Sequence, residues 1–305
     1  MENICIAGAS GFLGKNLSRY LSSSGYNILP ISLRDEKWEN QIDNNCETII
    51  NLVGKAHDHD GKSSEKEYYE VNLDCTKMLF NAFLKSSSVL FLHVSSLAAV
   101  EESEAQDELD ESAACNPISW YGMSKRRAEE WLMSQTLPQG KKLIIVRPPM
   151  VHGAGDKGNL GLLYKLISKG IPYPLASFDN RRSFISVENF CYFLDQIIIG
   201  EQKLTSGIYH VSDDESISTN EIIDIIKRVT NKKVINLSIP KSIIKLIAKS
   251  GDFLPIPLNS KRLKKMTSNL LVSNARIKTL LSIDKLPLTA EKGLEKTIES
   301  FRSQV

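Results

Sequence analysis

Short apolar runs alternate with longer amphipathic segments through the first half of the chain. The apolar runs have the length of buried strands and span residues 3–7, 26–33, 48–53, 89–94 and 142–147. The segments between them have helical periodicity, as Leu13, Leu17 and Leu21 show, and the later ones span residues 70–85 and 121–136. Continuous apolar strands that alternate with helices predict an α/β fold, a doubly wound parallel sheet covered on both faces.

A glycine-rich turn follows the first apolar run at once. Gly8, Gly11 and Gly14 stand between the strand at 3–7 and a helix that ends near Ser22. The second strand completes a βαβ unit of about 30 residues, the context in which such glycines indicate dinucleotide binding. Glycines let the backbone approach a pyrophosphate, which the free amides of the helix N-terminus then hold. The sequence therefore predicts a Rossmann-type domain.

The pattern becomes irregular after Pro148. We expect helices at 162–169, at 190–199 and from a capping Thr219 to Val229, an extended piece at 183–187, and one more strand at 207–211. Prolines then divide the tail into short helices. These boundaries predict a dinucleotide-binding domain at residues 1–150, with a returning segment near 183–212, and a smaller, mostly helical substrate domain at 151–305.

Composition and charge argue against several classes of function. The net charge of +2 predicts no nucleic-acid partner. The apolar runs fall far short of the roughly 20 residues that span a bilayer, and the N-terminus enters a strand pattern directly, so we expect neither membrane insertion nor a signal peptide. Five scattered cysteines predict free thiols and a cytoplasmic location. His57, His59 and His152 lack partners at metal-ligand spacing, so no metal is expected.

Tyr121 and Lys125 are candidates for proton transfer. They are four residues apart, which places them on one face of the helix predicted at 121–136. A free tyrosine has a pKa of about 10, and a nearby ammonium favours the phenolate, so the pair could work near neutral pH. An exposed tyrosine one turn before a solvated lysine is the alternative. The glycine turn and Ser95-Ser96, about 25 residues before Tyr121, favour the catalytic interpretation.

These motifs together resemble a known superfamily. Gly8-x-x-Gly11-x-x-Gly14, Ser95-Ser96 and Tyr121-x-x-x-Lys125, in this order and spacing, resemble the extended short-chain dehydrogenase/reductases, in particular the NAD(P)-dependent nucleotide-sugar epimerase/dehydratase branch. The stretches at 147–153 and 180–188 are similar to UDP-glucose 4-epimerase-like proteins of surface-polysaccharide clusters, and among them to UDP-N-acetylquinovosamine dehydrogenases, which reduce a 4-keto sugar. The resemblance covers essentially the whole chain and implies a homodimer through the helices at 70–85 and 121–136.

The resemblance implies catalytic and cofactor-binding roles for individual residues. Tyr121 would be the acid/base on the sugar 4-oxygen, and Lys125 would hold the nicotinamide ribose and lower the tyrosine pKa. Ser96 would hydrogen-bond the same sugar oxygen, and Ser95 is the alternative residue for this role. Asn72 would support the site. The cofactor-binding residues would be Gly8, Ser10, Gly11, Phe12, Leu13, Gly14, Ser32, Arg34, Leu52, Lys125 and Pro148.

The resemblance also implies how the nucleotide sugar is bound. Asn159 and Arg182 match positions that bind the diphosphate, a task that suits the planar fork of arginine. Arg262 is a candidate for a second phosphate clamp, although the basic run at 261–265 can also be a plain solvated face.

The end of the second strand bears on the cofactor. An acidic residue usually stands there to bind the adenosine ribose of NAD. Ser32 occupies this place, Arg34 follows it, and a neutral residue beside an arginine would accommodate the phosphate of NADP. Asp35 could swing back and restore NAD preference. We therefore expect NAD(P), with NADP somewhat favoured.

The cofactor preference favours one reaction over another. A 4-keto reductase consumes NAD(P)H in every turnover, whereas a 4-epimerase retains its nicotinamide and commonly uses NAD. We expect reduction of a UDP-linked 4-keto-6-deoxy-N-acetylhexosamine, with UDP-hexose or UDP-N-acetylhexosamine 4-epimerisation as the alternative. A 4,6-dehydratase would carry an acidic pair where Leu97-Ala98-Ala99 stands. A non-catalytic nucleotide sensor would have no need of the Ser96, Tyr121 and Lys125 set.

Overall fold

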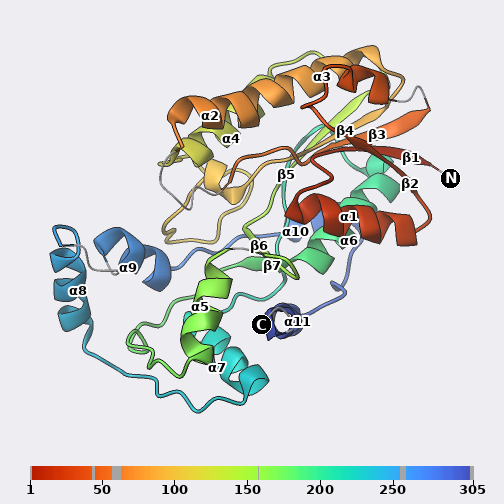
Figure 1. Cartoon of the computed structure of the whole chain (residues 1–305). Helices are drawn as coiled ribbons and strands as arrows, with labels where there is room; N and C mark the ends of the chain where they lie inside the picture. The colour runs from red at the N-terminus through yellow and green to blue at the C-terminus, as the bar shows by residue number, and fades with distance from the viewer. Residues whose placement is uncertain (1, 43–44, 57–62, 157, 255–258, 303–305) are drawn as a thin grey trace.

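The computed structural model describes residues 2–42, 45–56, 63–156, 158–254 and 259–302. Its main sheet has six strands in the order β2-β1-β3-β4-β5-β8, and every neighbouring pair is parallel (Figure 1). The strands are β1 (Asn3–Ala7), β2 (Asn27–Ile31), β3 (Cys46–Asn51), β4 (Leu90–Val94), β5 (Lys142–Arg147) and β8 (Gly207–His210). The predicted doubly wound parallel sheet is confirmed.

The strand order reverses at β1. β2 lies on one side of β1, whereas β3, β4, β5 and β8 follow in turn on the other side. In open parallel sheets, ligands bind beyond the carboxyl ends of the strands at such a reversal. The fold therefore places the most favourable ligand site at the ends of β1 and β3.

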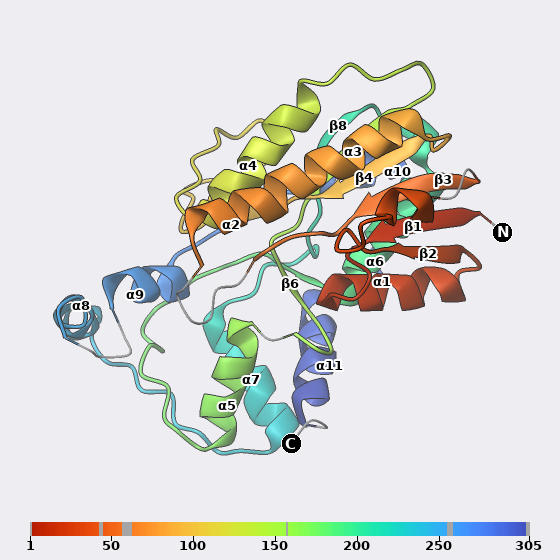
Figure 2. The same ribbon diagram turned by 45° about the horizontal axis from the view of Figure 1, so that its top comes forward.

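Helices cover both faces of the sheet, as Figures 1 and 2 show. Ile4 and Ile6 of β1 pack against α1 (Phe12–Ser23) and α6 (Val187–Ile199). The alternate residues Cys5 and Ala7 belong to a second core with α3 (Cys75–Lys85) and α4 (Trp120–Met133). Successive strand residues face opposite sides of the sheet, and both sides are covered by helices. The sequence of each strand is therefore apolar along most of its length.

Some helix boundaries differ from those predicted. The helix expected at 70–85 begins earlier, because Ser64 caps α2 (Glu65–Tyr69) and a π-helical turn, η2 (Glu70–Asp74), joins α2 to α3. In α7 (Thr219–Thr230), Ser218 is the N-cap in place of the predicted Thr219, since the Ser218 hydroxyl accepts from the Glu221 amide and Glu221 caps Ser218 in return. Short 3-10 turns lie at η1 (Trp38–Gln41), η3 (Leu97–Ala99) and η4 (Glu201–Lys203).

The second half of the chain adds a small sheet and a further helical core. β6 (Met150–His152) and β7 (Phe184–Ser186) pair in parallel. The helices are α5 (Asn159–Ser168), α7, α8 (Lys241–Ser250), α9 (Ser260–Thr267) and α11 (Ala290–Arg302), while α10 (Ala275–Leu281) packs on the main sheet with α1 and α6. Within the described ranges, no helix is both long and apolar enough to cross a membrane.

Candidate active site

The glycine turn after β1 is so tight that two of its glycines have no room for a side chain. Gly8 has a φ of +87°, and a Cβ added there would lie 2.9 Å from the carbonyl carbon of Leu52. A Cβ added to Gly14 would lie 2.2 Å from the Gly8 carbonyl oxygen. Only glycine combines this φ with such close approaches. The turn thus exposes bare backbone, which fits a pyrophosphate.

The start of α1 offers amides to an anion. α1 begins at Phe12, and its N-cap residue is Gly11, which has no side chain to cap the helix. No acidic residue lies in the first turn of α1. The free amides and the helix dipole both favour negative charge at this end. Ser10 is exposed in the same turn, and Phe12 and Leu13 are partly buried. The cofactor-binding residues predicted in this turn therefore lie together.

Leu52 and Pro148 lie at the same edge of the sheet as the glycine turn. The Leu52 amide donates to the Ala7 carbonyl oxygen over 2.9 Å, just beyond β3. The Pro148 carbonyl oxygen, just beyond β5, accepts from the Leu97 amide over 2.8 Å. Both residues therefore lie at the carboxyl ends of strands of the main sheet.

Ser32 and Arg34 are exposed just beyond β2. The Ser32 amide donates to the Gln41 side-chain oxygen over 3.0 Å. The Asp35 carboxylate accepts from the Lys37 amide over 3.0 Å and from Gln41 Nε2 over 2.8 Å. This carboxylate therefore bonds within its own loop.

Ser96 and Tyr121 come from separate segments and meet through a side-chain hydrogen bond. Ser96 follows β4 in extended conformation, and its Oγ accepts from the Ala98 amide over 3.1 Å. Tyr121 lies in the first turn of α4 and is partly exposed. A Cβ added to Gly122 would lie 2.4 Å from the Ala98 carbonyl oxygen, so this glycine lets α4 pack directly on the turn after Ser96.

Lys125 lies one turn after Tyr121 and points into the protein. It is 4% exposed, and its Nζ donates to the Val94 carbonyl oxygen over 2.9 Å. A Cβ added to Gly54 would lie 3.2 Å from this Nζ. Burial lowers the pKa of Lys125 to about 8, while the Glu129 carboxylate acts in the opposite direction. The ammonium is thus held at the carboxyl end of β4 with a pKa close to neutral pH.

The pKa of Tyr121 moves in the direction opposite to the expected one. Burial raises it above the ordinary value of 10.0, the Ser96 hydrogen bond lowers it, and the Glu102 carboxylate raises it further. The expected net lowering of this pKa is not found, because removing the phenolate from water costs more than its neighbours recover. The phenol is therefore neutral at pH 7, the state of a proton donor.

Asn72 joins the loop after β3 to α4. It is fully buried in η2, and its Oδ1 accepts from the Lys55 amide over 2.8 Å. Its Nδ2 donates to Ser124 Oγ over 2.8 Å and to the Lys55 carbonyl oxygen over 3.2 Å. Ser124 and Gly54 were not predicted from the sequence, although Ser124 stands directly before Lys125 and Gly54 stands three residues after β3.

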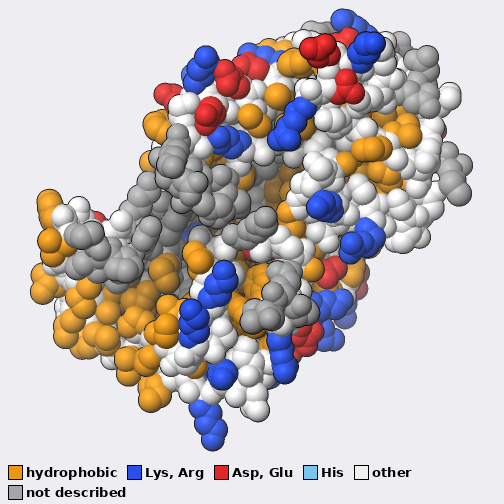
Figure 3. Space-filling view, viewed as in Figure 1, with side chains coloured by type: hydrophobic (Ala, Val, Ile, Leu, Met, Phe, Trp, Pro, Cys, Tyr) orange, Lys and Arg blue, Asp and Glu red, His pale blue; other side chains and the backbone are white. Residues whose placement is uncertain are grey.

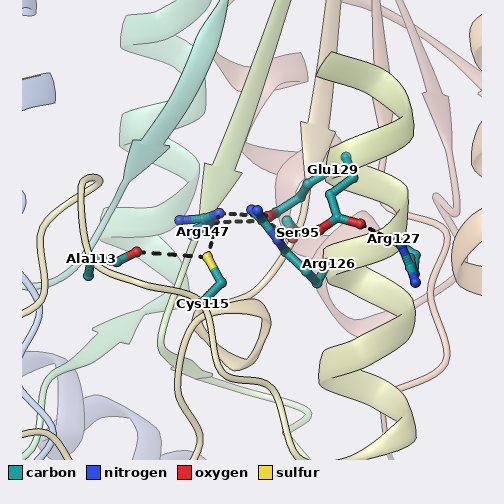
Figure 4. Close-up of polar contacts among 8 residues, drawn as sticks. Ser95, Ala113, Cys115, Arg126, Arg127, Glu129 and Arg147 are labelled. Atoms are coloured by element: carbon teal, nitrogen blue, oxygen red, sulfur yellow. Dashed lines mark hydrogen bonds and ion pairs between the residues drawn. The ribbon is translucent and has the colours of Figure 1, made fainter. Parts of the chain in front are cut away.

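Ser95 belongs to a different network, which Figure 4 shows. Its hydroxyl donates to Glu129 Oε1 over 2.6 Å. The Glu129 carboxylate also accepts from Arg147 Nε over 2.8 Å and from Arg147 Nη2 over 2.6 Å, and the two side chains are 0% and 2% exposed. Arg147 Nη2 further donates to Cys115 Sγ over 3.6 Å. This buried pair ties α4 to β5 and was missed from the sequence, although Glu129 stands one helical turn after Lys125.

Arg182 is the predicted diphosphate-binding residue whose side chain the structure describes. It is partly buried, and its Nη1 donates to the carbonyl oxygens of Ser103 over 3.1 Å and of Ser268 over 3.3 Å. The side chains of Asn159 and Arg262 lie outside the described residues, as do His57 and His59. His152 is buried with its Nδ1 2.9 Å from Thr297 Oγ1, a contact that joins β6 to α11.

Comparisons with known proteins agree with this geometry. A family model described as NAD dependent epimerase/dehydratase family matches residues 4–211. The chain is 27% identical to a UDP-glucose 4-epimerase of Vibrio cholerae over 325 residues, which cover 98% of this chain and 95% of the relative. A GDP-6-deoxy-D-mannose reductase of Pseudomonas aeruginosa is 22% identical over 74% of this chain and 79% of the relative. The solved structure of RMD from Pseudomonas aeruginosa complexed with NADPH has a TM-score of 0.76 at 18% identity over 99% of this chain and 100% of that chain, which shows the same fold.

Proposed function

The chain belongs to the NAD dependent epimerase/dehydratase family, and we propose that it is an NAD(P)-dependent oxidoreductase acting at C4 of a UDP-sugar. The observation that carries this proposal is the hydrogen bond between Ser96 and Tyr121, one helical turn before the buried Lys125. These three side chains converge at the carboxyl edge of the sheet, beside the glycine turn. The Ser96 hydroxyl, the neutral Tyr121 phenol and the Lys125 ammonium, whose pKa is about 8, can together transfer a proton beside the dinucleotide-binding turn.

The protein would hold the cofactor through backbone and through a few side chains. Gly8, Gly11 and Gly14 would bring the pyrophosphate onto the start of α1, with Ser10, Phe12 and Leu13 around it. Leu52, Pro148 and Lys125 would line the nicotinamide end. When bound, the nicotinamide supplies hydride to the sugar C4 or accepts hydride from it.

A preference for NADP is supported by the loop after β2. Ser32 and Arg34 are exposed there, and the Asp35 carboxylate is engaged by Lys37 and Gln41. An exposed guanidinium is suited to a 2′-phosphate, whereas a carboxylate that faced the ribose would repel it.

The chain's own residues would carry the proton. Tyr121, neutral at pH 7, gives its phenol proton to the sugar 4-oxygen as the C4 carbonyl is reduced. Ser96 donates to the same oxygen while negative charge develops on it, where a preorganised donor has its largest effect. Lys125 holds the nicotinamide ribose, and Asn72 fixes the backbone beside it through Ser124 and Lys55. Arg182, Asn159 and Arg262 would bind the UDP diphosphate.

We favour reduction of a 4-keto-6-deoxy-N-acetylhexosamine, because an NADP-compatible pocket suits a reaction that consumes NADPH. Epimerisation at C4 of a UDP-hexose or UDP-N-acetylhexosamine is the alternative, and it is favoured by the likeness to the Vibrio cholerae 4-epimerase. The same residues would serve both reactions, since an epimerase returns the hydride that it takes.

One incubation separates the two reactions. The protein is incubated with UDP-N-acetylglucosamine, with UDP-glucose and with an enzymatically made 4-keto-6-deoxy derivative, while NADPH oxidation and product NMR are followed. We expect NADPH-dependent reduction of the keto sugar. Epimerised product without added NADPH would establish the alternative.

A tyrosine substitution tests the assignment of the site. Tyr121→Phe removes the proton donor and should lower turnover by about 10² to 10⁴-fold. Tyr192→Phe removes the hydroxyl of a partly buried tyrosine on α6 and should leave turnover unchanged. Equal turnover in wild type and Tyr121→Phe would refute the role of Tyr121, and no turnover of any UDP-sugar by wild type would favour a nucleotide sensor.

A further inference from the structure

A band of exposed apolar side chains covers α8 and the segments on either side of it; we name it the α8 patch. Of the 17 large apolar side chains exposed in the described part of the chain, seven lie between residues 235 and 254. They are Ile235, Leu237, Ile243, Leu246, Ile247, Phe253 and Leu254. Figure 3 shows hydrophobic side chains gathered at the lower left, where Figure 1 places α8. Concentrated exposure of this kind marks an interaction surface.

The patch is a consequence of how α8 is anchored. Ile244 and Ala248 are the buried residues of α8, and they form one narrow stripe along the helix. Ile243, Leu246 and Ile247 are 48%, 67% and 40% exposed on a neighbouring stripe. The turn after the helix presents Phe253 at 90% exposure. The protein's own core therefore leaves most of the large apolar side chains of α8 and the turn after it in water.

Positive charge accompanies the apolar stripe. Lys241, Lys245 and Lys249 repeat every four residues and form a row on the other side of α8, where all three are exposed. Residues 232–254 hold five lysines and one acidic residue, Asp252, whereas the whole chain has a net charge of only +2. The Asp252 carboxylate accepts from the Ser260 amide over 2.9 Å and from the Ser260 hydroxyl over 2.6 Å. The region is thus both apolar and basic.

We propose that the α8 patch docks the protein on the surface of an anionic phospholipid bilayer. A helix with apolar residues on one side and lysines on the other lies in the plane of the bilayer interface, with its apolar side chains among the acyl chains. Anionic headgroups attract the lysines, so the charge of the patch complements this surface. A helix of 10 residues adsorbs in this way without crossing the bilayer.

A second copy of the chain complements the patch less well. In a two-fold contact the same surface meets itself, and residues 232–254 of a second copy offer the lysines one acidic residue against five further lysines. The homodimer implied by the resemblance would instead use α3 and α4, on the opposite side of the hollow that Figure 3 shows above α8. Docking through α8 leaves that face open and places the hollow beside the bilayer surface.

Vesicle flotation of the full chain tests the proposal. The purified protein is mixed with vesicles of phosphatidylglycerol and phosphatidylcholine in equal parts, and separately with vesicles of phosphatidylcholine alone. We expect flotation with the anionic vesicles, with weaker binding to the neutral ones and in about 1 M salt, where the Debye length falls to about 3 Å. Absence of flotation with anionic vesicles at low salt would overturn the proposal.

Matched variants assign the binding to the patch. Leu246→Gln should lower the partition onto anionic vesicles roughly tenfold, because it removes a side chain that would be buried among the lipids. Ile199→Gln alters a side chain of similar exposure, 65% against 67%, outside the patch and should have no effect. The triple change Lys241→Gln, Lys245→Gln, Lys249→Gln should weaken binding on the order of 100-fold.

A second lysine set controls for net charge, and a solution measurement tests the competing occupant. Lys66→Gln, Lys85→Gln and Lys296→Gln together remove the same charge from exposed positions elsewhere and should leave flotation nearly unchanged. Equal flotation of wild type and Leu246→Gln would contradict the proposal. A dimer in sedimentation analysis that Leu246→Gln abolishes would show that a second copy covers the patch.

Discussion

Replacing Glu129 by glutamine should destabilise the protein and leave the nearby catalytic side chains less well held. The Glu129 carboxylate is 0% exposed and accepts two hydrogen bonds from Arg147, which is itself 2% exposed, and one from Ser95. Removing one partner of a buried ion pair costs about 3–5 kcal/mol, because the other charge is left in a medium that solvates it poorly. Glutamine keeps one acceptor oxygen, so we expect a loss of about 3 kcal/mol.

Urea unfolding and thermal scans measure this loss. A loss of about 3 kcal/mol should lower the Tm by about 5 °C in a chain of this size. Glu130→Gln is the matched control, since Glu130 is the next residue on α4 and its ion pairs with Arg126 and Arg127 are partly exposed. Ion pairs of that kind contribute only about 0–1 kcal/mol. Equal destabilisation by Glu129→Gln and Glu130→Gln would refute the reasoning.

A double substitution separates the stranded charge from a simple packing defect. Glu129→Leu with Arg147→Met removes both charges, and replacing a buried pair by apolar residues of similar volume is often neutral or stabilising. The double variant should therefore be more stable than Glu129→Gln. If the double variant loses more stability than either single change, packing and not the charge explains the effect.

Other residues give equally specific expectations. In Gly14→Ala the new Cβ would meet the Gly8 carbonyl oxygen at 2.2 Å, so the glycine turn must shift. A shift of about 1 Å in the bound cofactor should lower kcat/KM about 100-fold. Gly207→Ala, whose Cβ meets its nearest atom at 3.9 Å, is the control. Turnover should fall as pH rises through about 8, where the Lys125 ammonium loses its proton. Because Glu129 raises the pKa of Lys125, Glu129→Gln should move this fall in turnover to lower pH. Arg34→Ala should raise KM for NADPH relative to NADH about tenfold, the effect of one lost hydrogen bond to a phosphate, and an unchanged KM ratio would exclude Arg34 from cofactor selection.

The local organisation of the site could be predicted from the sequence because it depends on near neighbours. A strand, three glycines and a helix within about 30 residues define the dinucleotide cradle, and a spacing of four places Tyr121 and Lys125 on one helix face. The continuous apolar runs likewise predicted a sheet covered on both faces, as the packing of Ile4 on one side and Cys5 on the other confirms.

Long-range packing decided what the sequence left open. Tyr121 and Lys125 keep their predicted spacing, but burial, which depends on segments far away in the chain, raises the pKa of one and lowers that of the other. Ser95 and Ser96 are neighbours in the sequence, yet alternation in an extended segment sends one to Glu129 and the other to Tyr121. Desolvation and side-chain pairing are properties of surfaces that meet only in the folded chain, so the tertiary structure alone assigns them.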